Sequence, residues 1–177
     1  MNRAVRMLCL LVWMAAGLLP AGASTRRDPL TEEETDQLRE AAQDPPLKLK
    51  LVLTFARLRL DSAEALRFDP KAGPDRGRQI HDLLEDFGNL VDELSDNVDA
   101  YAARQEDLRK PLAEVIAATN EFSVRLRDFK TAAAASPKEA RAYSFALEDA
   151  TDSVTAALQN AEELLAEQKE LFKKKKK

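Results

Sequence analysis

The chain has 177 residues, with 27 Lys and Arg against 31 Asp and Glu, and a formal net charge of −4. This acidic balance argues against nucleic acid as the main partner, because phosphate binding needs a basic face. One cysteine, one histidine and five glycines exclude a disulfide framework, a cysteine-ligated zinc site and a glycine-rich phosphate loop.

Residues 1–23 have the pattern of a secretory signal peptide. Two arginines are followed by an apolar run, a proline and a small-residue cleavage pattern: Arg3, Arg6, Met7–Leu19, Pro20 and Ala21-Gly22-Ala23. The apolar run of about 13 residues suits a signal peptide, and spanning a bilayer would need about 20. We therefore predict export to the periplasm or the cell exterior, with the mature chain starting near Ser24.

The mature chain would be acidic with a basic end. Removal of Arg3 and Arg6 leaves 25 basic against 31 acidic residues, a net charge of about −6. Five positive charges lie in the tail Lys173–Lys177, so the body before it carries about −11. The only cysteine, Cys9, lies in the signal peptide. We expect one domain over residues 24–172, followed by a Lys-rich tail over 173–177.

The first predicted element is a short helix. Thr31 and Glu34 have capping-box spacing, in which the hydroxyl accepts from the third amide and the carboxylate accepts from the cap amide. This helix should end near Gln43, because Asp44-Pro45-Pro46 follows. Asp44 is a good N-cap and Pro45 suits the first helical position, so the same residues should start a second helix.

The second element, Pro46–Phe68, allows two interpretations. Its apolar residues first alternate with period two, which is typical of a strand. However, they are mostly Leu, the run continues into the helix-favouring segment 61–66, and no second strand is available to pair with it. We predict a helix, apolar on almost all sides and therefore either central or covered by a partner. The segment Asp69–Pro74 should form a turn.

A heptad repeat defines the third segment. Apolar or small residues recur at alternating steps of three and four, with Gln105 as the polar exception: Leu84, Phe87, Val91, Leu94, Val98, Tyr101, Leu108, Leu112, Val115, Thr119, Phe122, Leu126, Phe129 and Ala133. The repeat continues through Pro111 without a change of phase. Either one helix is kinked there or two helices meet there. The kept phase and the lack of a nearby N-cap or glycine favour the kinked helix.

The last helix should begin at Ser136-Pro137-Lys138-Glu139, which combines an N-cap, a proline at the first position and a capping-box Glu. Its apolar face contains Ala140, Tyr143, Leu147, Ala150, Val154, Ala157, Ala161, Leu164 and Leu171. Residues 137–172 would span about 54 Å as one helix. The predicted fold is all-α: an elongated antiparallel bundle of three to four helices with heptad packing, kinked or broken at Pro111.

Few residues suggest a functional site. His81, Asp82 and Glu85 could ligate a divalent cation weakly, because positions i and i+4 share a helix face. One histidine cannot complete a di-iron bundle site. The acidic residues from Asp82 to Asp99 are interpreted as a solvated face. The lysines of the tail, Lys173, Lys174, Lys175, Lys176 and Lys177, could contact anionic head groups or simply form a solvated terminus. We predict no catalytic residues and no cofactor.

Two resemblances rest on short stretches. The signal peptide, Asp28-Pro29-Leu30-Thr31-Glu32-Glu33-Glu34, the Pro-Pro break and the Lys-rich end resemble uncharacterised secreted α-helical proteins of bacteria. Leu30-Thr31 followed by Glu34 is similar to the Leu-Thr-x-x-Gln motif of small periplasmic helical chaperones. Here Glu34 stands in place of the Gln and the motif occurs once.

The export signal and the heptads, without a catalytic constellation, predict a non-enzymatic exported protein that binds or scaffolds. Its partner would be another protein or a second copy. The alternatives are a periplasmic chaperone or stress adaptor, a peripheral membrane protein attached through its Lys tail, and a weak carboxylate metal-binding protein.

Overall fold

The computed structural model describes residues 28–174, and all of its regular structure is helical. Its elements are α2 (Glu32–Glu40), the 3-10 turn η1 (Ala41–Gln43), α3 (Pro45–Phe68), α4 (Arg76–Ala103), α5 (Arg109–Ala133), α6 (Pro137–Ala140) and α7 (Ser144–Lys174). The all-α prediction is confirmed, and the strand alternative for 46–68 is wrong. The predicted signal peptide and Lys175–Lys177 lie outside the described residues.

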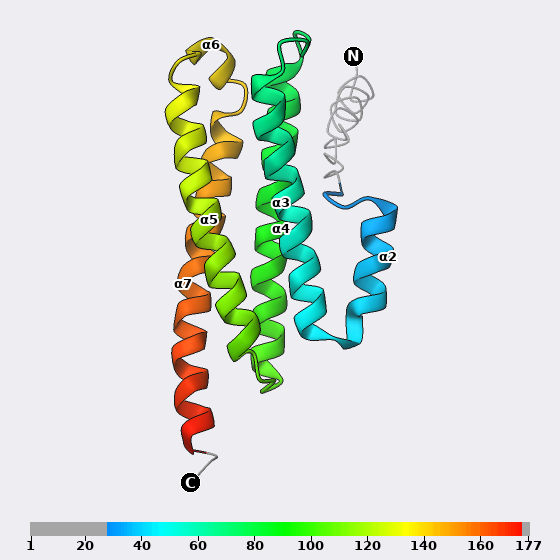
Figure 1. The fold of residues 1–177 in the computed structure, drawn as a ribbon, viewed down its shortest axis with the longest axis vertical. Helices are drawn as coiled ribbons and strands as arrows, with labels where there is room; N and C mark the ends of the chain where they lie inside the picture. The colour runs from blue at the N-terminus through cyan, green and yellow to red at the C-terminus, as the bar shows by residue number, and fades with distance from the viewer. Residues whose placement is uncertain (1–27, 175–177) are drawn as a thin grey trace, which may run out of the picture.

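Four long helices run along the long axis (Figure 1). Two antiparallel hairpins, α3 with α4 and α5 with α7, pack against each other. Across the junction α3 lies beside α5 and α4 beside α7, and each of these pairs is parallel. The sequence predicted an antiparallel bundle of three to four helices. The described residues form six α-helices, because the heptad segment is divided into α4 and α5 and the last predicted helix into α6 and α7.

The predicted helix starts near the N-terminus are confirmed by their hydrogen bonds. The Glu34 amide donates to Thr31 Oγ1 at 3.2 Å, and the Thr31 amide donates to Glu34 Oε2 at 2.8 Å. The Leu47 amide donates to Asp44 Oδ1 at 3.1 Å, with Pro45 at the first position of α3. Local capping chemistry therefore sets both starts.

The heptad residues form the core. Every predicted heptad position from Leu84 to Ala133 is buried, while Gln105 is exposed. Phe87 of α4 and Phe122 of α5 meet edge to face, with ring centroids 5.2 Å apart. The largely apolar α3 packs against α2, α4 and α5. Neighbouring helices of the same chain thus cover most of α3, although Leu47 and Leu58 stay exposed.

The favoured kinked helix at Pro111 is wrong. Helix α4 ends at Ala103, and α5 begins at Arg109 with Pro111 in its first turn. In a continuous helix the Pro111 ring would clash with the Asp107 carbonyl four residues earlier. The helix therefore ends before Pro111, and a new one begins. Gln105 turns the chain with φ 59°, and the Leu108 amide donates to Gln168 Oε1 of α7 at 2.8 Å. The start of α5 has no side-chain cap, and a side chain 60 residues away holds the turn before it.

The predicted start of the last helix also needs correction. Ser136 makes no side-chain cap, and α6 ends at Ala140 before α7 begins at Ser144. The Glu139 carboxylate accepts hydrogen bonds from Arg76 at 2.5 and 2.6 Å instead of completing a capping box. A tertiary ion pair thus replaces the local motif. Leu171, predicted on the apolar face, is 57% exposed.

Candidate binding face

The charges divide between the two parallel helix pairs. Helices α3 and α5 together contain ten Lys and Arg and five Asp and Glu. In contrast, residues 79–103 and 142–168 contain seven and six carboxylates, respectively, and no Lys or Arg. Since α4 lies beside α7, the two acidic stretches are neighbours. One side of the bundle is therefore acidic and the other contains a mixture of both signs.

On the α3/α5 side, many charges are neutralised by partners across the helix boundary. Arg57 makes a two-pronged contact with Glu121 at 2.8 and 3.2 Å. Arg125 contacts Asp61 at 2.6 Å and Glu64 at 2.9 Å. Hydrogen bonds from Arg57 hold the pKa of Glu121 below its ordinary value. These charge-assisted pairs join the two helices, and the surface they leave carries both signs with an excess of positive charge.

On the α4/α7 side, ten carboxylates are exposed to solvent. We call the exposed surface of α4 and α7 the acidic face. Its exposed carboxylates are Glu85, Asp92, Asp96, Asp99, Glu148, Asp149, Asp152, Glu162, Glu163 and Glu167. The Asn160 amide donates to Asp99 at 2.8 Å and links the two helices. Crowded like charges in this arrangement create a negative potential that attracts cations.

A shallow groove of about 290 Å³ lies between α4 and α7 within this face. Its floor includes Gly88 and Ala150, and a Cβ atom added to Gly88 would lie 3.6 Å from the Ala150 Cα. Glu85, Asp92 and Asp149 line the walls. Small residues bring the two helices close, and the carboxylates stand on either side of the seam.

Two rings border the same groove, those of His81 and Phe145. The Phe145 side chain is 76% exposed, the highest value among the exposed large apolar residues of the described chain. An aromatic ring beside several carboxylates suits a cationic ligand with apolar parts, because ring faces and carboxylates both attract positive charge.

The predicted metal ligands His81, Asp82 and Glu85 do come together. One ligand atom from each residue lies within 4.8 Å of the others, and the three side chains are half-buried or exposed. His81 Nδ1 and Asp82 Oδ1 are 3.4 Å apart. An imidazole and two carboxylates fit a weak divalent cation site. Cation binding at this cluster stays a prediction, and His81 and Glu85 also line the groove.

Asp86 does not belong to the predicted solvated face. It is 7% exposed, and its Oδ2 lies 4.0 Å from Arg59 Nε. Arg59 also contacts both carboxylate oxygens of Glu34, at 2.9 and 2.5 Å. Burial alone would raise the pKa of Glu34, but hydrogen bonds from Arg59 and Thr31 lower it overall. This network fixes α2 onto α3 and α4, and no local sequence pattern indicated it.

The described part of the Lys tail is limited. Lys173 is exposed and lies 2.7 Å from Glu170 on the same helix. Helix α7 ends at Lys174, and the remaining three lysines lie outside the described residues. Among residues 28–174, no helix combines the length and apolarity needed to cross a bilayer.

Comparison with known proteins gives no relative: no family model matches the chain, and neither do curated proteins or solved structures. The functional argument therefore depends on the charges, the groove and the exposed rings alone.

Proposed function

We propose that this chain is an exported, non-enzymatic binding or scaffolding protein whose acidic face binds a basic segment of another protein. The observation that carries the proposal is the set of ten exposed carboxylates on two neighbouring helices, within stretches 79–103 and 142–168 that contain no Lys or Arg. Self-repulsion of this kind costs stability within one chain. A positively charged partner would relieve it and would be attracted over long distances.

The groove supports a partner that is apolar as well as basic. Phe145 is 76% exposed beside Glu85, Asp92 and Asp149. Aromatic residues at the centre of a polar surface commonly anchor protein interfaces. A basic amphipathic helix satisfies both features, with its apolar side on Phe145 and its cations toward the carboxylates.

The test uses a lysine- and leucine-rich amphipathic peptide as the probe. Fluorescence anisotropy would measure its Kd for the chain from Ser24 and for the triple variant Glu85→Gln, Asp92→Asn, Asp149→Asn. We expect the Kd to rise by about 10-fold or more, because each contact contributes on the order of 0.5–1 kcal/mol. A separate Phe145→Ala variant should weaken binding at high as well as low salt.

The matched control neutralises three exposed carboxylates elsewhere: Glu32→Gln, Glu33→Gln and Glu114→Gln. Both triple variants have the same net charge, so only position differs. If the control weakens the peptide equally, net charge alone explains binding and the acidic face is not a specific surface. If neither variant has an effect, the proposal is wrong.

The chaperone alternative depended on an uncovered apolar groove. An apolar hollow of about 510 Å³ lies between the end of α5 and the start of α7, lined by Ala133, Ala140, Tyr143 and Leu147 among others. The chaperone alternative would be favoured over the acidic face if the chain suppressed client aggregation and a substitution in the lining of this hollow, such as Ala140→Glu, removed that suppression.

A further inference from the structure

The apolar hollow of about 510 Å³ lies where the chain crosses from α5 to α7 (Figure 1). The crossing begins after Ala133, passes through the short helix α6 and ends at Ser144. Arg76 of α4 contacts both carboxylate oxygens of Glu139, at 2.5 and 2.6 Å, and so fixes α6 to the start of α4. Small side chains line the hollow on both sides of the crossing: Ala133, Ala134 and Ala140.

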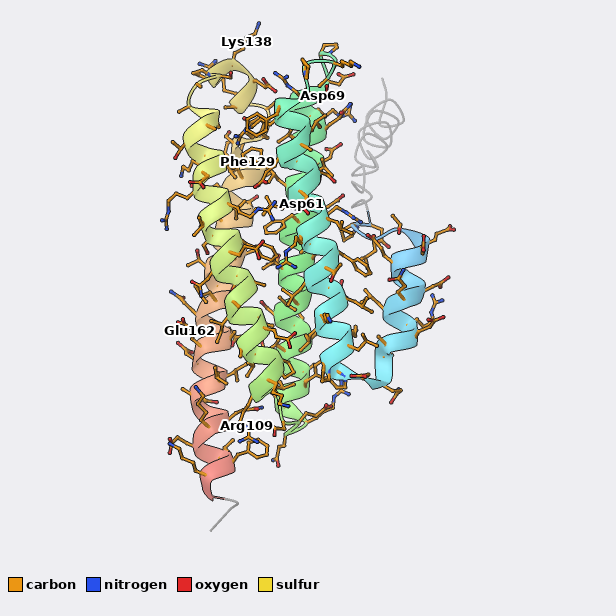
Figure 2. All side chains as sticks on the ribbon, viewed as in Figure 1. Asp61, Asp69, Arg109, Phe129, Lys138 and Glu162 are labelled. Atoms are coloured by element: carbon orange, nitrogen blue, oxygen red, sulfur yellow. The ribbon has the colours of Figure 1, made fainter. Side chains whose placement is uncertain are left out.

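The floor of this hollow is a fixed part of the core. Tyr143 and Leu147 line it and are only 2% and 4% exposed. The Tyr143 ring meets Phe129 of α5 edge to face, with centroids 5.7 Å apart. The Arg67 guanidinium of α3 lies 4.5 Å from the Phe129 ring centroid, and Figure 2 shows Phe129 near the end of the bundle that carries Lys138 of α6. Since neighbouring helices hold these rings, the hollow is preformed, and its volume lies in the range of small-molecule sites.

Two cations stand on the rim of the hollow. Lys130 of α5 and Arg141, in the turn before α7, are exposed and line it. Neither side chain forms an ion pair with another residue of the described range 28–174. Glu148 supplies one carboxylate, so the charged lining consists of two cations and one anion. An apolar floor below an excess of positive charge suits a ligand with an apolar body and one negative charge.

We propose that this hollow binds a small amphiphilic monocarboxylic acid, of the class of medium-chain fatty acids. The apolar body lies against Ala140, Tyr143 and Leu147, and the carboxylate lies between Lys130 and Arg141. Ten residues line the hollow, whereas each side of a standard protein interface contributes roughly 20–30, so its size favours a small molecule over a protein segment. The groove of the acidic face is lined by other residues, and the two proposals stand independently.

The experiment is a fluorescence titration of the chain from Ser24 with anilinonaphthalene sulfonate, a dye that combines an apolar body with one negative charge. Decanoate and the neutral decanol then compete with the dye, which gives a Kd for each. We expect one saturable dye site and displacement by decanoate. Added salt should weaken decanoate relative to decanol, because the carboxylate contacts cations on an exposed rim. A lack of saturable dye binding, or no displacement by decanoate, would overturn the proposal.

Charge variants test the rim. Lys130→Gln with Arg141→Gln should raise the Kd of decanoate about five-fold and leave that of decanol unchanged. Glu148→Gln should lower the Kd of decanoate about two-fold, because it removes the one carboxylate of the lining. The matched control is Arg127→Gln with Lys138→Gln, two exposed cations outside the lining. Equal weakening in both double variants would overturn the proposal, since net charge would then explain the effect.

A filling variant tests the hollow itself. Ala140→Phe should place a ring in the hollow and prevent dye binding, whereas Ala135→Phe, at an exposed position outside the lining, should not. Circular dichroism shows whether both variants are folded, and the exposed charge variants decide the matter if Ala140→Phe is not. Phe145→Ala should leave the Kd of decanoate unchanged, and a loss there would assign the ligand to the acidic face and overturn the proposal. Suppression of client aggregation without decanoate binding would assign the hollow to a protein client instead.

Discussion

The two parallel helix pairs have the same arrangement but different chemistry. Between α3 and α5, arginines contact carboxylates of the neighbouring helix, as in Arg57 with Glu121 and Arg125 with Asp61. Between α4 and α7, Gly88 faces Ala150, and Asn160 donates to Asp99. One pair is joined on its outer side by ion pairs, and the other by close approach of small residues.

This difference shows on which side the charged side chains make contacts within the chain. Arg57, Arg59 and Arg125 of α3 and α5 serve contacts between helices, whereas the exposed carboxylates of residues 79–103 and 142–168 face solvent with no Lys or Arg in the same stretches. Exposed ion pairs contribute little to stability. Apolar packing in the core must therefore stabilise both helix pairs. The outer surface of α4 and α7 is then available for recognition.

The largest effect should come from the packing that both pairs share. Phe122 of α5 is fully buried and meets Phe87 of α4 edge to face. Phe122→Ala should lower the free energy of unfolding by about 3–5 kcal/mol, because it removes apolar contacts and leaves a cavity. Urea denaturation measures this loss, and the exposed Val124→Ala on the same helix should change stability by no more than about 0.5 kcal/mol. Similar losses in both variants would show that the shared core does not hold the bundle.

A smaller effect is expected on the ion-paired side. Arg125 contacts Asp61, Glu64 and Glu121, and its side chain is 19% exposed. Arg125→Met should cost about 1 kcal/mol at low salt, because a network contributes more than one exposed pair. The cost should shrink as salt is added. Arg127→Met, at an exposed position on the same helix, is the control, and a cost independent of salt would assign the effect to packing instead.

On the small-residue side, two glycines of α4 should respond with opposite signs. A Cβ atom at Gly88 would sit 3.6 Å from Ala150, an ordinary contact, whereas one at Gly77 would lie 2.9 Å from the Ala142 Cβ. Gly88→Ala should therefore stabilise the chain by up to about 1 kcal/mol through helix propensity. Gly77→Ala should destabilise it, because a neighbour must shift. Thermal melts compare the two, and destabilisation by Gly88→Ala would mean that the α4/α7 contact tolerates no added atom.

Patterns within one helix were sufficient to predict most of the fold. The heptad positions from Leu84 to Ala133 are buried, and the caps at Thr31 and Asp44 form as predicted. The errors occur where a distant residue intervenes. The Leu108 amide donates to Gln168 in the turn before α5, and Arg76 binds the Glu139 carboxylate where a capping box was predicted. Local sequence patterns do not predict such long-range contacts.

The sequence predicts the composition of the candidate surface but not the contact between its two stretches. The absence of Lys and Arg from residues 79–103 and 142–168 can be counted directly. That the two stretches lie side by side could not be inferred, because contacts between the parallel helices join residues more than 60 apart, such as Asp99 with Asn160. For the same reason the sequence predicts a solvent-exposed Asp86, whereas the structure buries it beside Arg59.

The smallest effect concerns pH and the ion pairs between α3 and α5. Hydrogen bonds and the charge of Arg57 hold the pKa of Glu121 below its ordinary value of 4.5. Between the folded and unfolded pKa values the unfolded chain binds more protons. The stabilisation from Glu121 is therefore complete above about pH 4.5 and is lost as the pH falls through the folded pKa.

Glu121→Gln should therefore cost about 0.5 kcal/mol at neutral pH, because the Glu121 side chain is 44% exposed and solvent screens the pair. The difference from the unmodified chain should vanish in acid. Urea denaturation across this range tests the sign, with Glu114→Gln on the same helix as the control. A difference that stays constant down to about pH 3 would mean that Glu121 acts through its shape and not its charge. The ion-paired side would then resemble the small-residue side, and the contrast between the two pairs would reduce to packing alone.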